Sequence, residues 1–454
     1  MDSRSVYVVG AGPAGLFAAR KIAVAGHQVT IFNRDIRPGG LAEYGIYPMK
    51  HHMKAGLRKQ FVKILGLPNV EYFGNVALRC GGSVTVDSLR AWQPAAIVFA
   101  VGAQGTKKLG MPGEESRGVY SAKDFVYHYN ALPPFSSADF STGRRVAIVG
   151  MGNVMVDIAR WLLLDQPGPK PEEVTVIARR GPFEVKFDEK EFDYVEQFLD
   201  RRLFREELAR VAGAVAAAGQ DVSTVADSAF PWLKSEPAAV PESKLTFRFL
   251  TSPVGIEPGP SGRIERLRVV DNLLVRQGEE TKPRATDKES ALPFDTLIFA
   301  IGDVADPTVG LPYGKNEYVT NTDPADPDRA GYEVFDAATG QALAGNYVVG
   351  WARKASEGLV GKARFDAERG CEHILKYLEH SSQRVTPTAA EILDELQAAN
   401  DSVVTKQGVE QLFQAEARHA QALGLPEFKH PTNQDMLAAM RQSSEARCLT
   451  LATG

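Results

Sequence analysis

Cysteine is scarce in this chain. Cys80, Cys371 and Cys448 are the only three among 454 residues, and they lie far apart. An odd number of isolated cysteines argues against a disulfide framework, a zinc site and a protein-bound iron–sulfur cluster. No Cys-x-x-Cys pair is present, so the sequence also excludes chemistry that runs through a redox-active cysteine pair.

The chain also lacks a large net charge and long apolar runs. The formal net charge is −4, so no basic surplus points to a nucleic-acid partner. No apolar run reaches the roughly 20 residues that a membrane-spanning helix needs, and residues 1–5 show no signal-peptide pattern. We therefore expect a cytoplasmic protein without nucleic-acid or membrane partners. The length of 454 residues allows two or three domains, and the 44% hydrophobic content allows a sizeable buried core.

Strand-like and helix-like segments alternate along most of the chain. Four apolar runs end in glycine, at residues 10, 102, 150 and 302, and helical patterns occupy residues 13–25 and 154–164. Residues 244–258 and 262–275 read as strands of an antiparallel excursion, and helical patterning dominates from Glu391 onward. This alternation predicts an α/β fold with parallel sheets.

The first glycine turn, residues 10–15, reads GAGPAG, a complete G-x-G-x-x-G between a strand and a helix. Gly10 permits the tight turn, Gly12 lets a pyrophosphate approach the backbone, and Gly15 lets the helix pack closely on the strand. The phosphates would meet the helix N-terminus. An acidic residue usually ends the next strand and holds the ribose; here Asn33 could bond a hydroxyl without the charge. A tight turn without a ligand is the alternative.

The second glycine turn, residues 150–155, reads GMGNVM and is less regular. Met155 stands where glycine or alanine normally allows close packing. Arg179 and Arg180 follow the next strand, at the offset where the 2′-phosphate of NADP would lie. Arginine pairs with phosphate through two aligned N–H bonds, whereas a site that prefers NAD places an acid there. An empty turn with a solvated arginine pair is the alternative.

Two dinucleotide turns in one chain predict two different nucleotides. The simplest pairing is FAD in the first turn and NADP(H) in the second. A flavin next to a nicotinamide exchanges a hydride with it, while the protein supplies placement and electrostatics.

Further segments resemble one family of flavoproteins over nearly the whole chain. They are GGLAEYGIYP at 39–48, FGNV at 73–76, MPGEESRGVYSAKDFVYHYNALP at 111–133, GNVMVDIAR at 152–160, RRGPFEVKF at 179–187, FRFLTSP at 247–253 and YVVGWARKASEGLVG at 347–361. In order and spacing, the chain resembles the adrenodoxin-reductase-type ferredoxin–NADP reductases, which are related to the glutamate synthase small-subunit group.

The resemblance implies two Rossmann-like, doubly wound, three-layer domains. An FAD-binding domain would comprise residues 1–105 and 303–454, with helices at its C-terminal end, and an NADP-binding domain of residues 106–302 would be inserted into it. Together with the turn glycines, the resemblance implies that FAD contacts Gly10, Gly12, Pro13, Ala14, Gly15, Asn33, Gly40, Leu41, Val76, Gly102, Trp351, Gly358, Leu359 and Val360. The NADP contacts would be Gly150, Gly152, Asn153, Val154, Arg179, Arg180 and Glu191.

The sequence departs from the family pattern near the implied catalytic residues. Glu43 stands where the family has a basic residue, and Lys50 where it usually has a histidine that helps to organise the active site with the glutamate matched by Glu191. Three alternatives remain open: His51 substitutes for that histidine, Lys50 pairs with Glu191, or the link is absent. A surface role for these residues is a further alternative.

The resemblance implies an enzyme that passes a hydride from NADPH to FAD and then single electrons to a ferredoxin-type iron–sulfur protein or another one-electron acceptor. Residues 200–210 carry four arginines, which could form a docking patch or a solvated helix face diluted by Glu206 and Glu207. A flavin-dependent monooxygenase and an electron-transfer subunit of a larger complex are the rival functions. The missing cysteine pair excludes a thioredoxin-reductase-like enzyme.

Overall fold

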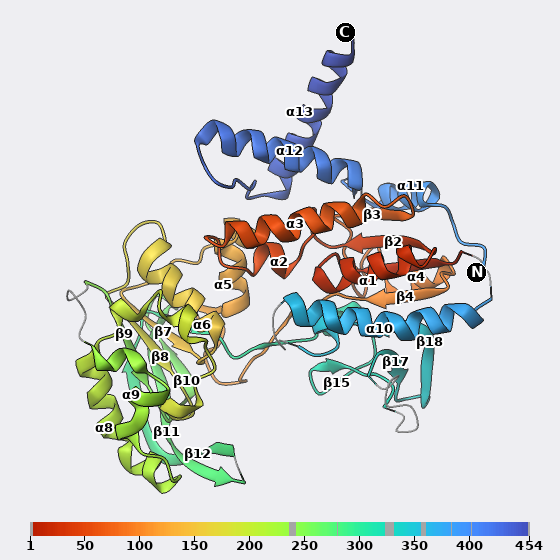
Figure 1. Ribbon diagram of the computed structural model, residues 1–454. Coiled ribbons are helices and arrows are strands. Elements are labelled where there is room, and N and C mark those ends of the chain that lie inside the picture. The colour runs from red at the N-terminus through yellow and green to blue at the C-terminus, as the bar shows by residue number, and fades with distance from the viewer. Residues whose placement is uncertain are drawn as a thin grey trace. The chain divides into compact units, whose positions relative to one another are not determined.

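A computed structural model describes residues 3–235, 242–278, 280–322, 331–355, 360–382, 384–400 and 402–452, with the last ten as backbone only. The chain divides into two compact units. Unit 1 comprises Met1–Thr106, Tyr127–Ser137 and Gly302–Gly454, and unit 2 comprises Lys107–Val126 and Ala138–Ile301. The inserted domain expected at 106–302 corresponds to unit 2, except that residues 127–137 group with unit 1 (Figure 1).

Unit 1 is built on a seven-stranded sheet with the order β17-β18-β4-β1-β2-β3-β19. Its five inner strands are parallel and the two edge strands antiparallel. The strands are β1 (Ser5–Val9), β2 (Gln28–Asn33), β3 (Val70–Gly74), β4 (Ala96–Phe99), β17 (Glu333–Asp336), β18 (Gln341–Val348) and β19 (Val404–Thr405). Two short antiparallel pairs join β5 (Gly105–Thr106) to β14 (Asp303–Val304) and β15 (Tyr313–Gly314) to β16 (Glu317–Tyr318).

Helices cover both faces of this sheet, as the alternation along β1 requires. Val6 and Val8 pack with α1, α3 and α10, whereas Tyr7 and Val9 pack into the core on the other face. The helices of unit 1 are α1 (Pro13–Val24), α2 (Leu41–Tyr44), α3 (His51–Leu65), α4 (Val86–Ala91), α10 (Val360–His380), α11 (Ala389–Ala399), α12 (Lys406–Leu423) and α13 (Asn433–Ala452). No helix in the described part of the chain is long and apolar enough to cross a membrane.

Unit 2 repeats this architecture around a parallel five-stranded sheet with the order β6-β13-β7-β8-β9. Its strands are β6 (Val119–Ser121), β7 (Arg145–Val149), β8 (Glu173–Ile177), β9 (Lys244–Arg248) and β13 (Thr296–Phe299). Its helices are α6 (Asn153–Arg160), which continues as a π-helical turn (Trp161–Asp165), α7 (Glu189–Phe192), α8 (Arg201–Ala217) and α9 (Val225–Ser228). The helix α5 (Ala122–Tyr129) begins in unit 2 and ends in unit 1.

An antiparallel ribbon extends this unit. It consists of β10 (Thr251–Pro258), β11 (Ile264–Gln277) and β12 (Glu280–Pro293). The prediction that all of residues 244–258 belong to the antiparallel excursion is wrong, because residues 244–248 are the edge strand of the parallel sheet, in register with Glu173–Ile177. The break comes at Leu250, whose φ of 48° turns the chain. The strand β12 has no apolar pattern that would predict a strand, because it is polar and mostly exposed.

Candidate cofactor-binding sites

The first glycine turn leaves β1 with the geometry that a dinucleotide turn requires. Gly10 has φ of 102° and donates its N–H to the carbonyl of Phe32 at 2.7 Å. A Cβ on Gly10 would lie 2.5 Å from the carbonyl oxygen of Ala100, and a Cβ on Gly15 would lie 1.9 Å from the oxygen of Gly10. Glycine is therefore required at both positions for helix α1 to approach the sheet.

Unit 2 repeats the same turn. Gly150 has φ of 126°, donates to the carbonyl of Ile177 at 3.0 Å, and would place a Cβ 2.2 Å from the oxygen of Ala300. The irregular sixth residue, Met155, is fully buried, so helix α6 accepts a long side chain where α1 needs glycine. The two units therefore present equivalent turns, which differ in the sixth residue of the motif.

Both helices that follow these turns begin without a side-chain cap. Gly12 and Gly152 occupy the N-cap positions, and neither helix has an acidic residue in its first turn. Pro13 stands in the first turn of α1, where a missing N–H costs nothing. The first N–H groups of a helix need an acceptor, and its dipole favours an anion there. The backbone of each unit therefore fits a phosphate at its glycine turn.

Two other segments of unit 1 meet the first turn. Gly40 adopts φ of 50°, and a Cβ there would lie 3.0 Å from the Cα of Gly12. Gly350 adopts φ of 67°, and its Cβ would lie 2.5 Å from that of Ala14. Trp351 follows in the same 3₁₀ turn and is half-buried. The segments around Gly40 and Gly350, which both carry predicted FAD residues, thus lie next to the first glycine turn.

The side chain of Asn33 forms hydrogen bonds with several groups of the protein itself. Its Oδ1 accepts the N–H of Ala11 at 2.9 Å. Its Nδ2 donates to the carbonyl of Asp35 at 2.7 Å and also reaches the carbonyl of Arg37 and the hydroxyl of Tyr72. Both amide hydrogens of Asn33 are used inside the protein, so Asn33 ties the glycine turn to the end of β2. Its Oδ1 keeps a second lone pair that can accept a hydroxyl, and the ribose contact stays a prediction.

The remaining predicted FAD residues of unit 1 lie at strand and helix ends. Leu41 starts α2, the buried Val76 donates its N–H to the carbonyl of Asn33 at 2.9 Å, and Gly102 follows β4 with φ of 71°. These are the carboxyl ends of parallel strands, where α/β sheets bind ligands. Val360 begins α10 and is half-buried, whereas Gly358 and Leu359 lie outside the described residues.

Arg179 and Arg180 directly follow β8 in unit 2. The carbonyl of Arg179 accepts a hydrogen bond from Asn272 Nδ2 at 2.9 Å, and the carbonyl of Arg180 accepts one from the N–H of Leu250 at 3.0 Å. Neither guanidinium has a hydrogen bond or ion pair with any residue that the structure describes. Two unneutralised arginines held at the end of a strand suit a phosphate dianion.

A loop returns from the arginines to the second glycine turn. Lys186 donates its backbone N–H to the carbonyl of Met151 at 2.9 Å. Asn153 and Asp188 exchange two hydrogen bonds of 2.7 and 2.8 Å. Val154, in the first turn of α6, is 46% exposed. The ammonium group of Lys186 is exposed and has no partner in the described part of the chain. It is a cation that the sequence motifs do not single out.

The three predicted catalytic residues belong to different units. Glu191 is half-buried in α7 of unit 2, whereas Lys50 caps α3 in unit 1 and His51 follows it. His51 Nδ1 lies 3.4 Å from Glu427 Oε2. The pairing of Glu191 with Lys50 or His51 stays a prediction.

Glu43 lies in a buried cluster of charges. Its carboxylate contacts Arg58 at 2.7 Å and Lys429 at 2.8 Å, with Arg37 close by. Burial alone would raise the pKa of Glu43, but the three cations outweigh it and hold the pKa well below its usual range. Glu43 is therefore ionised, and the unusual acid after GGL is neutralised by cations from other segments, including one near the C-terminus.

Lys54 is the outlying cation of this cluster. Its side chain is only 2% exposed, and Nζ donates to Asn130 Oδ1 at 2.8 Å. Burial, and next the positive charge of Lys429, lower the pKa of Lys54 to about 7. Glu43 and Glu427 act in the opposite direction. Neither Lys54 nor Lys429 has a sequence signal, because only the fold brings them beside α2.

The arginines of residues 200–210 all interact within the protein, which favours the solvated helix face over the docking patch. Arg201 is buried and pairs with Glu196 at 2.7 Å. Two others form ion pairs on their own helix, α8: Arg202 with Glu206 at 2.6 Å and Arg210 with Glu207 at 2.7 Å. Arg205 also interacts with another group of the protein. The solvated alternative is therefore the better description of this helix.

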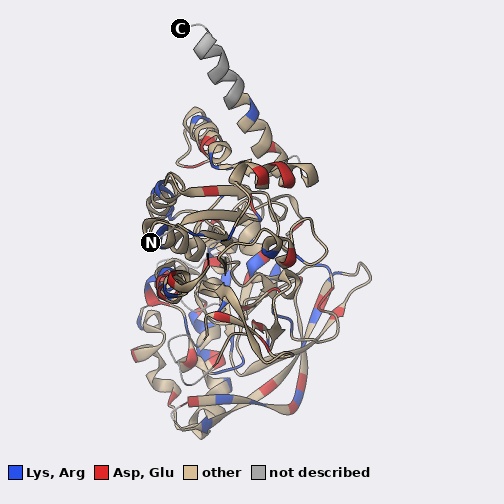
Figure 2. Ribbon diagram, turned by 90° about the vertical axis from the view of Figure 1, so that its right-hand side faces the viewer, with Lys and Arg blue, Asp and Glu red and all other residues tan. Residues whose placement is uncertain are grey.

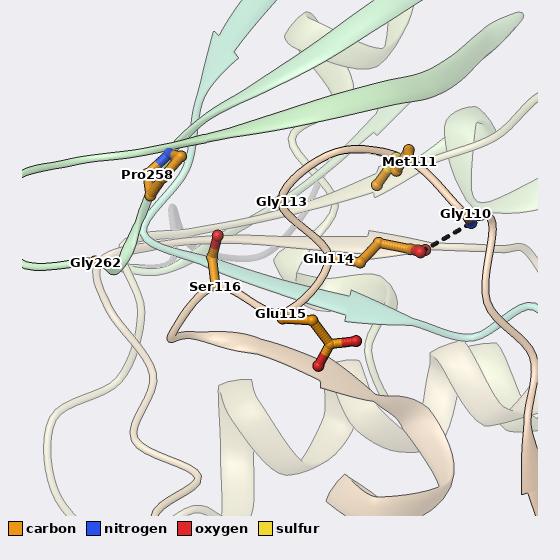
Figure 3. A pocket seen from close by; sticks show the side chains of 8 residues that line it. All are labelled: Gly110, Met111, Gly113, Glu114, Glu115, Ser116, Pro258 and Gly262. Atoms are coloured by element: carbon orange, nitrogen blue, oxygen red, sulfur yellow. Dashed lines mark hydrogen bonds between the residues drawn. The ribbon is translucent and has the colours of Figure 1, made fainter.

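A hollow of about 470 Å³ lies in unit 2. Figure 3 shows the residues that line it: Gly110, Met111, Gly113, Glu114, Glu115, Ser116, Pro258 and Gly262. Glu114 accepts the backbone N–H groups of Leu109 and Gly110, each at 2.8 Å, and Glu115 pairs with Lys108. The carboxylates of Glu114 and Glu115 are thus bonded within the protein. None of the predicted site residues lines the hollow, so we assign it no part in the cofactor-binding sites.

Comparison with known proteins identifies the family. A family profile described as pyridine nucleotide-disulphide oxidoreductase matches residues 4–325. The chain belongs to this family. It nevertheless lacks the disulphide of the family's name among the described side chains: Cys80 is exposed and free, and Cys371 is free and buried. Burial raises the pKa of the Cys371 thiol to about 12, which keeps it unreactive.

Two groups of relatives span most of the chain. NADPH-ferredoxin reductase FprA of Mycobacterium tuberculosis is 29% identical over 413 residues, which is 83% of this chain and 85% of the relative. The mitochondrial NADPH:adrenodoxin oxidoreductase of Arabidopsis thaliana is 26% identical over 467 residues, covering 96% of this chain and 95% of the relative. These relatives confirm the resemblance stated from the motifs.

The fold is confirmed as well. The structure of Mycobacterium tuberculosis FprA in complex with NADPH superposes with a TM-score of 0.80 at 26% identity, covering 97% of this chain and 100% of that chain. The similarity extends over both units, the three-layer α/β architecture and the helices near the C-terminus.

Proposed function

We propose that this protein is an FAD-dependent NADPH oxidoreductase that delivers single electrons to a ferredoxin-type iron–sulfur protein in the cytoplasm. One observation carries the proposal: two uncapped helix N-termini follow two glycine turns, and within the described ranges only the second is accompanied by unpaired arginines. The relatives, named for NADPH and for ferredoxin or adrenodoxin, support the same assignment.

The residues fit the two cofactors as follows. The first turn, with Gly12, Ala14 and Gly40, would hold the FAD pyrophosphate, and Trp351 would lie along the ring system. In unit 2, the start of α6 would hold the pyrophosphate of NADPH and Arg179 with Arg180 its 2′-phosphate. Glu191 would face the nicotinamide half.

The chemistry belongs to the cofactors, and the protein contributes binding and electrostatics. When bound, NADPH supplies a hydride and FAD accepts it and passes the electrons on singly. One NADPH therefore reduces two molecules of a one-electron acceptor and releases one proton. No covalent nucleophile takes part, and no group of three or more potential metal ligands occurs among the described residues.

Rapid-mixing measurements of flavin bleaching test this proposal. Purified protein should be yellow, and NADPH should bleach it with at least about a hundredfold higher second-order rate constant than NADH, because two charge-assisted contacts separate the nucleotides. Colourless protein that cannot be reconstituted with FAD, or a preference for NADH, would falsify the assignment.

The rival functions give different results in the same preparation. A monooxygenase would consume oxygen with NADPH only when an organic substrate is added. A non-catalytic subunit would bind flavin yet fail to reduce ferricyanide with NADPH. Steady NADPH-driven reduction of ferricyanide without a substrate is the result that we expect.

A further inference from the structure

The first turns of helix α10 lie directly behind the Gly350 turn. Asp366 Oδ2 accepts the N–H of Gly350 at 2.6 Å, and Ala367 beside it is fully buried. A helix with its side chains is about 10 Å wide. The outer side of these turns is thus about one helix diameter from the segment that, in the proposed function, lines the flavin.

That outer side carries an exposed aromatic ring between two cations. Lys362, Phe365 and Arg369 follow the spacing i, i+3, i+7 and share one side of α10, which we call the α10 face. All three are exposed, and Phe365 is 67% exposed. A large exposed aromatic side chain with cations around it is typical of a surface that binds a partner.

The helices beside the α10 face make the region more positive. α1 and α3 contain no Asp or Glu, although the protein as a whole has a net charge of −4. Figure 2 shows that over most of the ribbon the two signs of charge are mixed. Exposed cations on these helices are Arg20, Lys59 and Lys63. Since α1 packs against both α3 and α10, their charges act on the same side of unit 1.

The acidic residues nearby are already neutralised. Glu372 pairs with Lys21 at 3.0 Å and Glu368 with Arg364 at 2.8 Å. Lys362 has no ion pair with any residue in the described ranges. In the described part of the chain, Lys362 and the exposed cations of α1 and α3 are therefore the positive charges left here without an acidic partner.

We propose that the α10 face is the docking surface for an acidic one-electron iron–sulfur protein. Phe365 supplies the apolar contact, Lys362 the adjoining charge, and the exposed cations of α1 and α3 the longer-range attraction. The inference rests on the proposed function and specifies where its partner binds. Two acceptor molecules dock in turn for each NADPH oxidised, and each leaves with one electron.

The test compares two acceptors with holoenzyme variants. Lys362→Glu and Phe365→Ser are assayed with NADPH against a purified acidic plant-type [2Fe–2S] ferredoxin and against ferricyanide, which needs no docking surface. Matched controls are Lys282→Glu, an exposed lysine on β12, and Val385→Ser, a 94% exposed apolar residue.

Each variant should lower kcat/KM for the ferredoxin about fivefold or more, the usual effect of removing an interface anchor. The loss in Lys362→Glu should shrink as salt rises from 20 to about 300 mM, because charge attraction is screened, whereas the loss in Phe365→Ser should persist. Ferricyanide reduction should stay within about twofold of wild type, and both controls should resemble wild type.

The docking surface is refuted if both variants reduce ferredoxin as wild type does at every salt concentration. It is also refuted if ferricyanide reduction falls in parallel, since the residues would then act on the flavin site. Failure of the proposed function is distinct, because wild-type protein would then not reduce ferricyanide with NADPH at all. Wild type that reduces ferricyanide but not the ferredoxin would refute the docking surface and the ferredoxin part of the proposed function, while the NADPH-dependent flavin reduction would stand.

Discussion

Lys429 Nζ lies 2.8 Å from Glu43 Oε1 and donates to the backbone carbonyl of the same residue at 3.1 Å. A lysine that follows helix α12 thus neutralises an acid that lies two residues after Leu41, at the predicted flavin wall. The side chain of Lys429 is only 9% exposed and also lies over the ring of Tyr44. The segment near the C-terminus is therefore part of the structure that holds α2.

Removing this cation should strongly destabilise unit 1. Lys429→Met leaves the buried Glu43 short of one partner, and breaking a buried pair costs about 3–5 kcal/mol. The double variant Glu43→Gln/Lys429→Met should recover more than half of that loss, because no charge is then left unpaired. Urea unfolding followed by flavin release measures both. Equal stability of wild type and Lys429→Met would contradict the prediction.

Lys54 should make stability depend on pH in a defined direction. Its pKa is lowered to about 7 in the folded protein, against about 10.4 when unfolded. Between these values the unfolded state binds more protons, so stability rises with pH, with a slope of up to about 1.4 kcal/mol per pH unit from this group. Below pH 7 the lysine is charged in both states, and its full cost is present.

The variant Lys54→Met isolates this effect. Its stability relative to wild type should be highest at pH 6 and should decline steadily between pH 7 and 10, because only wild type gains on deprotonation. Loss of the Asn130 contact adds an offset that does not vary with pH. Chemical unfolding at pH 6, 8 and 10 provides the measurement, and a difference that stays constant with pH would show that Lys54 does not titrate in this range.

The arginine pair should set the preference for NADPH. Arg179→Ala and Arg180→Ala should each lower kcat/KM for NADPH by about 10–100-fold, the value of one charge-assisted hydrogen bond, and leave that for NADH within about threefold. Lys186→Ala is the comparison, since a cation beside the glycine turn would act on both nucleotides alike. Equal losses with NADPH and NADH in the arginine variants would place these residues away from the 2′-phosphate.

The two kinds of glycine in unit 1 should respond oppositely to alanine. In Gly15→Ala the Cβ would lie 1.9 Å from the oxygen of Gly10, so we expect loss of bound FAD or of soluble protein. Gly56, in the middle of α3, has no atom within 4 Å of a Cβ. Gly56→Ala should therefore stabilise the protein by about 0.5–1 kcal/mol. Thermal unfolding and the flavin content of the purified variants test both expectations.

The sequence by itself determined the features that depend only on neighbouring residues, such as the glycine turns and the buried strands. A turn that needs positive φ and close backbone approach requires glycine at Gly10 and Gly150, and the apolar runs before them must be buried strands, so both turns and the α/β class were readable. The family assignment followed because these short-range requirements recur in a characteristic order.

Only the tertiary structure decided which distant groups share an environment. The sequence predicts that Asn33 contacts a ribose, and only the fold shows that it also bonds Ala11, Asp35 and Tyr72. Glu43 and Lys429 are separated by hundreds of residues, and no local pattern encodes their contact. Charge pairing and desolvation depend on distance in space, which the order of residues leaves open until the chain has folded.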